Sequence, residues 1–134
     1  MSIDSFQDLL QAARQQPQPQ RLLFVFAGAE LPEDASPAQR AAFAEGQGGA
    51  LAPLMCADKT PAELPSFDAL VTESEQFGPS WVIVFVAAMS GQGGVEPTSA
   101  QAEAPLQKMV EAIKAGQIAA YLPFNREGLP VNLL

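Results

Sequence analysis

Two long apolar runs restrict the fold more than any other feature of this 134-residue chain. Leu22–Ala29 (LLFVFAGA) and Trp81–Met89 (WVIVFVAAM) contain no charged side chain and no alternation of apolar with polar residues. This pattern is typical of a β-strand that is covered on both faces, because a strand with one face in water alternates. The two runs therefore predict the central strands of a sheet.

Two further segments carry a proline inside an apolar stretch. Ala50–Cys56 contains Pro53, and Ile118–Phe124 contains Pro123. Proline has no N–H to donate to a neighbouring strand, so proline-bearing strands belong near the edges of a sheet. The sequence thus predicts a single α/β (or α+β) domain, in which helices pack on a central mixed sheet of four to five strands.

The chain also contains a near-duplication. The strand at Leu22 aligns with the strand at Val82, and Leu51-Ala52-Pro53-Leu54 aligns with Tyr121-Leu122-Pro123-Phe124. Each half then consists of a strand, a loop, a helix and a proline strand, although buried strands often resemble one another by chance. We divide the domain into an N-terminal helix (1–16), a Pro/Gln connector (17–20), a first repeat-like half (21–56), a helical connection (57–79), a second repeat-like half (80–124) and a terminal turn and strand (125–134).

Four helices are expected from capping residues that precede apolar stripes. Ser2 is expected to begin the first helix, Ser36-Pro37 begins a helix that ends near Gly46, and Thr60-Pro61-Ala62-Glu63 has the spacing of a capping box. The last helix begins at Ser99 or at Pro105. The helix after Pro65, which Gly78-Pro79 ends, places five residues on one face: Phe67, Leu70, Val71, Ser74 and Phe77.

The residue types exclude several chemistries. The chain has no histidine, so it has no His-dependent triad and no histidine-ligated metal. Cys56 is the only cysteine, which excludes an intrachain disulfide and a thiolate zinc site within the chain. We therefore expect no metal and no cofactor.

Charge and hydropathy also limit the partners. The 7 basic and 15 acidic residues give a net charge of −8, which argues against nucleic acid and anionic membranes because both attract clustered Lys and Arg. The apolar runs are shorter than the about 20 residues that span a bilayer. The N-terminus lacks the basic start and apolar stretch of a secretory signal, so we expect a cytoplasmic protein.

Three segments are candidates for a ligand site. The glycine loop, with Ser90, Gly91, Gly93 and Gly94, follows a central strand, where backbone amides can hold an anion. The loop matches neither GxGxxG nor GK[ST], which leaves a flexible connector as the alternative. If the two apolar strands run parallel, this loop meets Glu30 and the Cys56–Lys59 segment at the carboxyl ends of the strands.

The other two segments have ordinary alternatives. Asp58, Lys59 and the helix start at Thr60 follow Cys56 and would lower the pKa of its thiol if they lie close, but a lone cysteine is more often a small core residue. Glu30 leads into an acidic loop that either binds a cation or is simply solvated.

Two aromatic residues and the edge strands are candidates for an interface. Trp81 and Tyr121 are core residues if they are buried and interface residues if they are exposed. Apolar edge strands often pair with a second subunit, so a homodimer is one expectation, and the acidic balance suits a basic protein partner as another.

Several stretches resemble known families. The segments RLLFVFAGAELPEDASPAQRAAF, GGALAPLMCADKTPAEL, WVIVFVAAMSG and AEAPLQKMVEAIKAG are together similar to a family of small uncharacterised bacterial proteins, some labelled "ribonucleotide reductase subunit alpha". A reductase large subunit needs several cysteines and a far larger barrel, so the label implies no reductase activity for a chain with one cysteine. FQDLLQAARQQP and ALAPLMCADKTPAEL resemble SseB-like proteins more weakly, which implies an α/β module without established catalytic residues.

The sequence therefore favours a non-catalytic module that binds a protein partner or itself. The alternative is a small-ligand-binding protein or an enzyme whose site is formed by the Glu30 loop, the Cys56–Lys59 segment and the Ser90–Gly94 loop.

Overall fold

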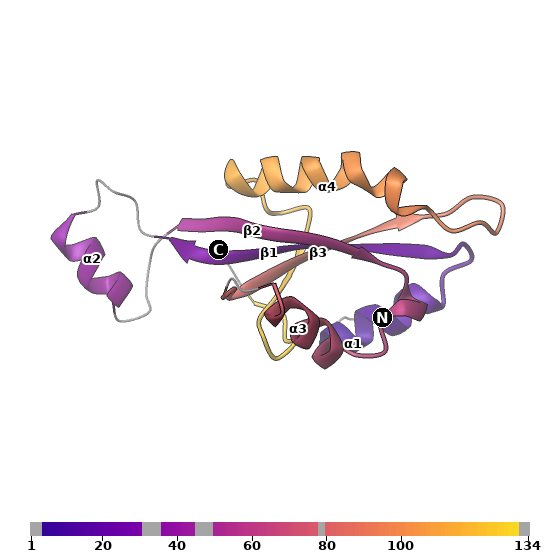
Figure 1. The fold of residues 1–134 in the computed structure, drawn as a ribbon, viewed down its shortest axis with the longest axis horizontal. Coiled ribbons are helices and arrows are strands. Elements are labelled where there is room, and N and C mark those ends of the chain that lie inside the picture. Colours follow the sequence, from indigo (N-terminus) through magenta and orange to yellow (C-terminus); the bar gives the residue numbers. More distant parts are fainter. Residues whose placement is uncertain (1–3, 31–35, 45–49, 78–79, 132–134) are drawn as a thin grey trace.

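The computed structural model describes residues 4–30, 36–44, 50–77 and 80–131. One four-stranded sheet lies between α4 (Ser99–Lys114) on one face and α1 (Phe6–Arg14) with α3 (Phe67–Glu75) on the other (Figure 1). The short 3-10 helix η1 (Pro61–Glu63) connects the sheet to α3. The chain is thus a single mixed α/β domain, which confirms the predicted fold class.

The apolar runs occupy the centre of the sheet and the proline strands occupy its edges. The order is β2-β1-β3-β4, in which β1 spans Gln20–Glu30 and β3 spans Ile83–Ser90. The edge strands are β2 (Ala50–Lys59) and the three-residue β4 (Leu122–Phe124), which is shorter than the predicted segment from 118 to 124. The predicted positions of the proline strands are confirmed.

The strand directions differ from the prediction. All three strand pairs are antiparallel, so the expected mixed sheet is wrong. The apolar pattern shows only that a strand is buried on both faces. An antiparallel sheet with helices on both sides buries its strands in this way, as a parallel sheet does. Strand direction therefore could not follow from the pattern.

An aromatic cluster holds α1 and α3 on their face of the sheet. The Phe6 ring of α1 lies 4.9 Å from Phe67 and 5.6 Å from Phe124, and Phe26 lies 5.1 Å from Trp81. Tilted and edge-on ring pairs at such distances each contribute about 0.5–1.5 kcal/mol beyond area burial. The opposite face is mainly aliphatic, with α4 residues Leu106, Met109 and Ile113 packed on Val25 and Phe85.

The helix starts follow side-chain caps that are partly those expected. The Ser5 hydroxyl caps α1 by accepting from the Asp8 N–H, so the start predicted at Ser2, outside the described residues, is not the one used. Thr98 and Gln101 form a capping box that begins α4 at Ser99, which leaves Pro105 inside the helix. The predicted capping box at 60–63 is confirmed, and the element that it begins is η1. Helix α3 starts separately, after its own cap at residue 66.

The two repeat-like halves share an order of elements but place their helices differently. The halves are β1-α2-β2, with α2 spanning Pro37–Ala44, and β3-α4-β4. Helix α4 packs on the sheet, whereas α2 lies apart from it and residues 36–41 are exposed (Figure 1). The similarity therefore extends to strand order and not to packing. The helix ends predicted at Gly46 and at Gly78-Pro79 lie outside the described residues.

Candidate functional site

The outer side of β2 is an open edge of the sheet. Within the part of the chain that the structure describes, β2 pairs with β1 alone. Its register shifts opposite Phe26/Ala27, next to Pro53, and runs regularly from Met55 to Lys59. We call Met55–Lys59 the β2 edge. Alternate N–H and C=O groups of an edge strand point away from the sheet and can pair with another chain.

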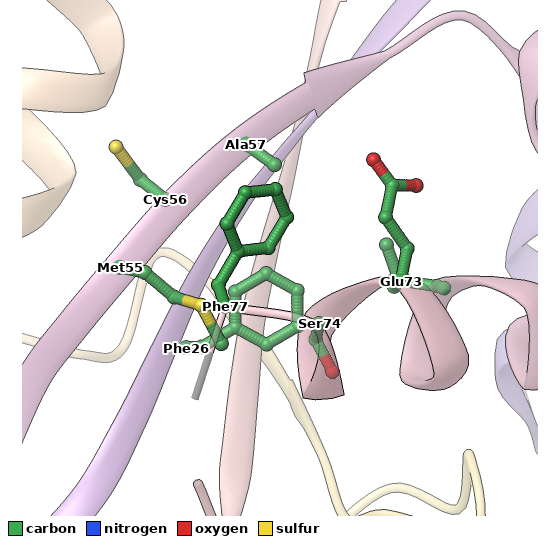
Figure 2. A pocket seen from close by; sticks show the side chains of 8 residues that line it. Phe26, Met55, Cys56, Ala57, Glu73, Ser74 and Phe77 are labelled. Carbon is green, nitrogen blue, oxygen red and sulfur yellow. The ribbon is translucent and has the colours of Figure 1, made fainter. Parts of the chain in front are cut away.

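A cavity of about 180 Å³ opens beside the β2 edge, between β2 and α3 (Figure 2). A cavity of about 150 Å³ can hold a benzene ring, so there is room here for one aromatic or branched side chain. Most of the lining is apolar, and the Glu73 carboxylate at the rim forms a 2.8 Å ion pair with Lys59. We call this cavity the α3 pocket; its lining residues are Phe26, Met55, Cys56, Ala57, Leu70, Glu73, Ser74 and Phe77.

Phe77 is exposed at this pocket, although the helical stripe predicts that it is buried. The helix α3 ends at Glu75, and the Phe77 N–H donates to the Ser74 carbonyl in a turn. Because Phe77 follows the end of the helix, its side chain leaves the buried stripe and is 69% exposed. A large aromatic side chain that is exposed over an apolar cavity is typical of an interaction surface.

A second hollow lies on the α4 side of β2. It has a volume of about 530 Å³, and it combines the apolar Leu106 and Val110 with the polar Glu103 and Gln107. The Cys56 thiol points towards this side, away from the α3 pocket (Figure 2). We call this surface the α4 hollow; its lining residues are Cys56, Glu103, Ala104, Leu106, Gln107 and Val110.

Cys56 is not the core residue that its apolar neighbours predict. It is exposed, since it lies in the middle of an edge strand rather than in a central one. The alternative in which Lys59 lies close to the thiol is not what the structure has, because the Lys59 ammonium pairs with Glu73 of α3. Residues three positions apart in a strand face opposite sides of the sheet, so the cation and the thiol are separated.

Asp58 belongs to a polar cluster that closes the end of the β2 edge. The buried Arg21 side chain donates from Nε to the Pro97 carbonyl at 2.7 Å and from Nη1 to Asp58 at 2.6 Å. Asp58 also accepts from the Ser99 hydroxyl at 3.0 Å, and Glu63 lies 3.9 Å from Arg21. We call this group the Arg21 joint because it ties β1 to β2, η1 and the start of α4. A single arginine at the head of an apolar run was the sequence signal for it.

The Glu63 carboxylate of the joint is stabilised in its ionised form. The Thr60 N–H donates to it at 2.9 Å and the Thr60 hydroxyl at 3.0 Å. These hydrogen bonds, assisted by the nearby positive charge of Arg21, hold the pKa of Glu63 below its ordinary value.

The three segments of the predicted ligand site do not converge. Glu30 pairs with Ala50 at one end of the sheet, whereas Ser90 pairs with Gln20 at the other end. Cys56 pairs with Val25 in mid-strand. The convergence required parallel strands, so the antiparallel pairing removes the combined site.

The glycine loop is held by the chain's own hydrogen bonds. The Gly91 N–H donates to the Pro19 carbonyl and the Gly94 N–H to the Gln18 side chain, both at 2.8 Å. Gly93 and Gly94 have φ of 59° and 79°, the left-handed conformation that a tight two-residue turn requires. A Cβ atom at Gly91 would lie 2.0 Å from a backbone oxygen. Ser90 accepts a side-chain hydrogen bond from Gln20 at 2.8 Å, so this loop is anchored to the connector before β1.

The two aromatic candidates contribute to packing. Trp81 is 1% exposed, and its indole N–H donates to the Ser74 hydroxyl at 2.8 Å. The Arg126 guanidinium lies 4.7 Å from the centre of the Trp81 ring, which is a cation–π distance. Tyr121 is half-buried against the α4-side core. Trp81 is therefore a core residue rather than an exposed anchor.

The described residues contain no group of three or more Asp, Glu, Cys or His side chains placed to hold a metal ion. Among the same residues, no helix combines the length and apolar character needed to cross a membrane. Comparison of the chain with protein-family models, with curated proteins and with solved structures gives no match.

Proposed function

We propose that this protein is a non-catalytic protein-interaction module, and that its binding surface is the β2 edge together with the α3 pocket. The observation that carries the proposal is the exposure of Phe77 over an apolar cavity, beside a strand whose outer side has no partner among the described residues. Exposed apolar surface next to unpaired backbone groups favours contact with another polypeptide.

The size of the α3 pocket favours one side chain of a protein over a whole small molecule as its occupant. Small-molecule sites usually occupy about 300–1,000 Å³, and the α3 pocket has a volume of about 180 Å³. A single side chain of a partner fits such a space. The remainder of the contact would then come from the partner's backbone and from side chains outside the pocket.

The charged groups around the β2 edge also support a binding role. Asp58 is paired with Arg21, and Lys59 is paired with Glu73. Every buried side-chain nitrogen and oxygen atom of the described residues has a hydrogen-bond partner. These side chains hold the fold together, and none is a buried, unpartnered polar group of the kind that catalysis often uses.

The resemblances and the single cysteine agree with this proposal. The resemblance to SseB-like proteins implies a module without established catalytic residues, and the reductase label found in the small bacterial family implies no reductase activity for a chain with one cysteine. We place the protein in the cytoplasm, where an exposed lone cysteine such as Cys56 stays reduced.

Affinity capture with matched variants tests the proposal. Wild type, Phe77→Ala and Val95→Ala are immobilised and exposed to a cell lysate, and each retained protein is purified and titrated against all three forms. Val95 is a suitable control because it is 68% exposed, close to the 69% of Phe77, and directly follows the glycine loop. We expect a partner that binds wild type and Val95→Ala and is lost with Phe77→Ala.

Self-association is measured on the same three proteins by light scattering over a range of concentrations. A dimer that Phe77→Ala alone dissociates would support the proposal with a second copy as the partner. The proposal would be contradicted if all three forms stay monomeric and retain the same proteins with equal affinity.

A further inference from the structure

We infer that the partner binds as an additional β-strand along the β2 edge, and that it is an extended segment with apolar and basic side chains. The inference rests on the proposed function and specifies its mode of binding and its ligand. An added strand pairs through its backbone with an open sheet edge, while pockets on either side of that edge select its side chains.

The positions of the two hollows carry the inference. Met55 and Ala57 face the α1/α3 side of the sheet, and Cys56 between them faces the α4 side. Side chains of a strand alternate between the two faces. A strand placed beside β2 therefore directs successive side chains alternately into the α3 pocket and the α4 hollow, which lie on opposite sides of the same five residues.

The β2 edge also sets the length of the added segment. Pro53 lacks an N–H group, and the register shift beside it interrupts regular pairing at one end. At the other end, β2 stops at Lys59 and η1 begins at Pro61. The regular part from Met55 to Lys59 suits a segment of about five to six residues, which is an ordinary strand length.

The charged residues of the edge do not obstruct an added strand. Natural sheets often protect an edge with a lysine that projects into the path of a pairing strand. The Lys59 ammonium instead lies 2.8 Å from Glu73 on the α3 side, and the Asp58 carboxylate is held by Arg21 and Ser99. Both charges are thus directed to the faces of the sheet, where they are neutralised.

The lining of the two hollows indicates the side chains of the partner. The α3 pocket is apolar and accepts one aromatic or branched side chain. The α4 hollow carries the Glu103 carboxylate and the Gln107 amide beside Leu106 and Val110, which suits a lysine or arginine whose methylene groups pack on the apolar part.

Charge also favours a basic partner over a second copy. The net charge of −8 attracts a basic segment, and two copies of the chain repel each other. The occupant that the surface fits is therefore a basic, apolar extended segment of another protein.

A designed peptide tests this inference on the full chain. The probe is an N-acetylated peptide of about nine residues that alternates Phe, Leu or Val with Lys or Thr, and its affinity is measured by calorimetry. We expect binding that weakens about tenfold with Phe77→Ala, that is unchanged with Val95→Ala, and that weakens as salt rises.

Two modified peptides separate strand addition from simple adhesion. In one series the N-methyl groups lie on the amides that face β2, and in the other they lie on the amides that face solvent. We expect the first series to lose about tenfold in affinity and the second to keep its affinity. Replacement of Lys by Glu in the peptide should abolish binding, because the glutamates would then face Glu103. Equal effects of the two methylated series would overturn strand addition.

The thiol of Cys56 reports occupancy of the edge directly. It is the only cysteine, it is exposed, and it lies in the middle of the β2 edge, so its rate of alkylation by iodoacetamide follows access to this strand. We expect the peptide to slow alkylation of wild type and of Val95→Ala, and to slow that of Phe77→Ala much less at the same peptide concentration. Alkylation that is insensitive to the bound peptide would contradict the assigned location.

The outcomes distinguish this inference from the proposed function. Phe77→Ala could abolish capture of a partner while the designed peptide does not bind at all, methylated or not. In that case strand addition is wrong and the interaction module stands. If the chain is a dimer through β2 that excludes the peptide, the occupant is a second copy and the basic-segment assignment is wrong.

Discussion

The two edges of the sheet are built in opposite ways. The β4 edge has three residues, and its outer side is bonded to the terminal segment, since Phe124 bridges to Pro130 and the Val131 N–H donates to the Pro123 carbonyl at 3.1 Å. The β2 edge belongs to a ten-residue strand that pairs, within the described residues, on its inner side alone. Edge strands are usually kept short or covered because they promote association. The β2 edge, open within the described residues and flanked by the exposed Phe77, is therefore the place where we propose that the chain associates.

Phe124→Ala tests the closed edge and has the largest expected effect. Phe124 is 1% exposed and packs edge-on against Phe6, so its truncation leaves a cavity in the aromatic cluster. We expect the free energy of unfolding to fall by about 3–5 kcal/mol, measured by urea denaturation. Leu122→Ala is the matched control on the same strand, and it should cost much less because Leu122 is exposed. Equal losses in the two variants would show that β4 is not packed as described.

Arg21→Met tests the joint that fixes the end of the β2 edge. The substitution leaves the Asp58 carboxylate partly buried without its cation. We expect a loss of about 3 kcal/mol in the free energy of unfolding, at the low end for a broken buried pair, because Asp58 keeps its hydrogen bond from Ser99. Lys108→Met, on the exposed side of α4, is the control for loss of one positive charge. A loss no greater than that of the control would contradict the role of the joint.

Phe77→Ala tests the open edge and should hardly change stability. Because the Phe77 side chain is mostly exposed, its removal should change the free energy of unfolding by no more than about 0.5 kcal/mol. The same urea titrations give the loss in the free energy of unfolding for Phe124→Ala. A large loss for Phe124→Ala and a small one for Phe77→Ala would show that one edge is packed and the other is not. A large loss would mean that Phe77 is a core residue after all, and that its loss of binding reflects misfolding.

Glu63→Gln has the smallest expected effect and is visible only as a pH dependence. The pKa of Glu63 is lowered in the folded protein, so its ionised form stabilises the fold at any pH above the pKa that this carboxyl has in the unfolded chain. This stabilisation is lost as the pH falls through the folded-state value. Unfolding titrations between pH 7 and pH 3 should therefore show wild type slightly more stable than Glu63→Gln at neutral pH, with the two curves converging in acid. Parallel curves over the whole range would remove this assignment.

Much of the fold could be predicted from single residues and short patterns. The apolar runs placed β1 and β3 at the centre, and Pro53 and Pro123 placed their strands at the edges, because a missing N–H cannot serve two neighbours. The capping box at 60–63 was equally direct. These features depend on residues that are neighbours in the sequence, so short patterns are enough to predict them.

The rest depends on contacts between distant segments. Burial on both faces did not distinguish antiparallel from parallel strands, and this error created a ligand site that joined Glu30 to the Ser90–Gly94 loop. Phe77 satisfied the helical spacing, but α3 ends at Glu75, before its side chain could join the buried stripe. The hollow beside Cys56 depends on where α4 packs, and the strand alone does not encode that position.

Residue-resolved hydrogen exchange of the strand amides tests the central difference most directly. In the free protein, alternate amides of Met55–Lys59 should exchange much faster than the amides of β1 and β3, since they point to solvent. With the basic alternating peptide present, the same amides should become protected, while the amides of the closed β4 edge should stay unchanged. Protection of the whole β2 edge in the free chain, or no change on adding the peptide, would contradict an open edge that binds an added strand.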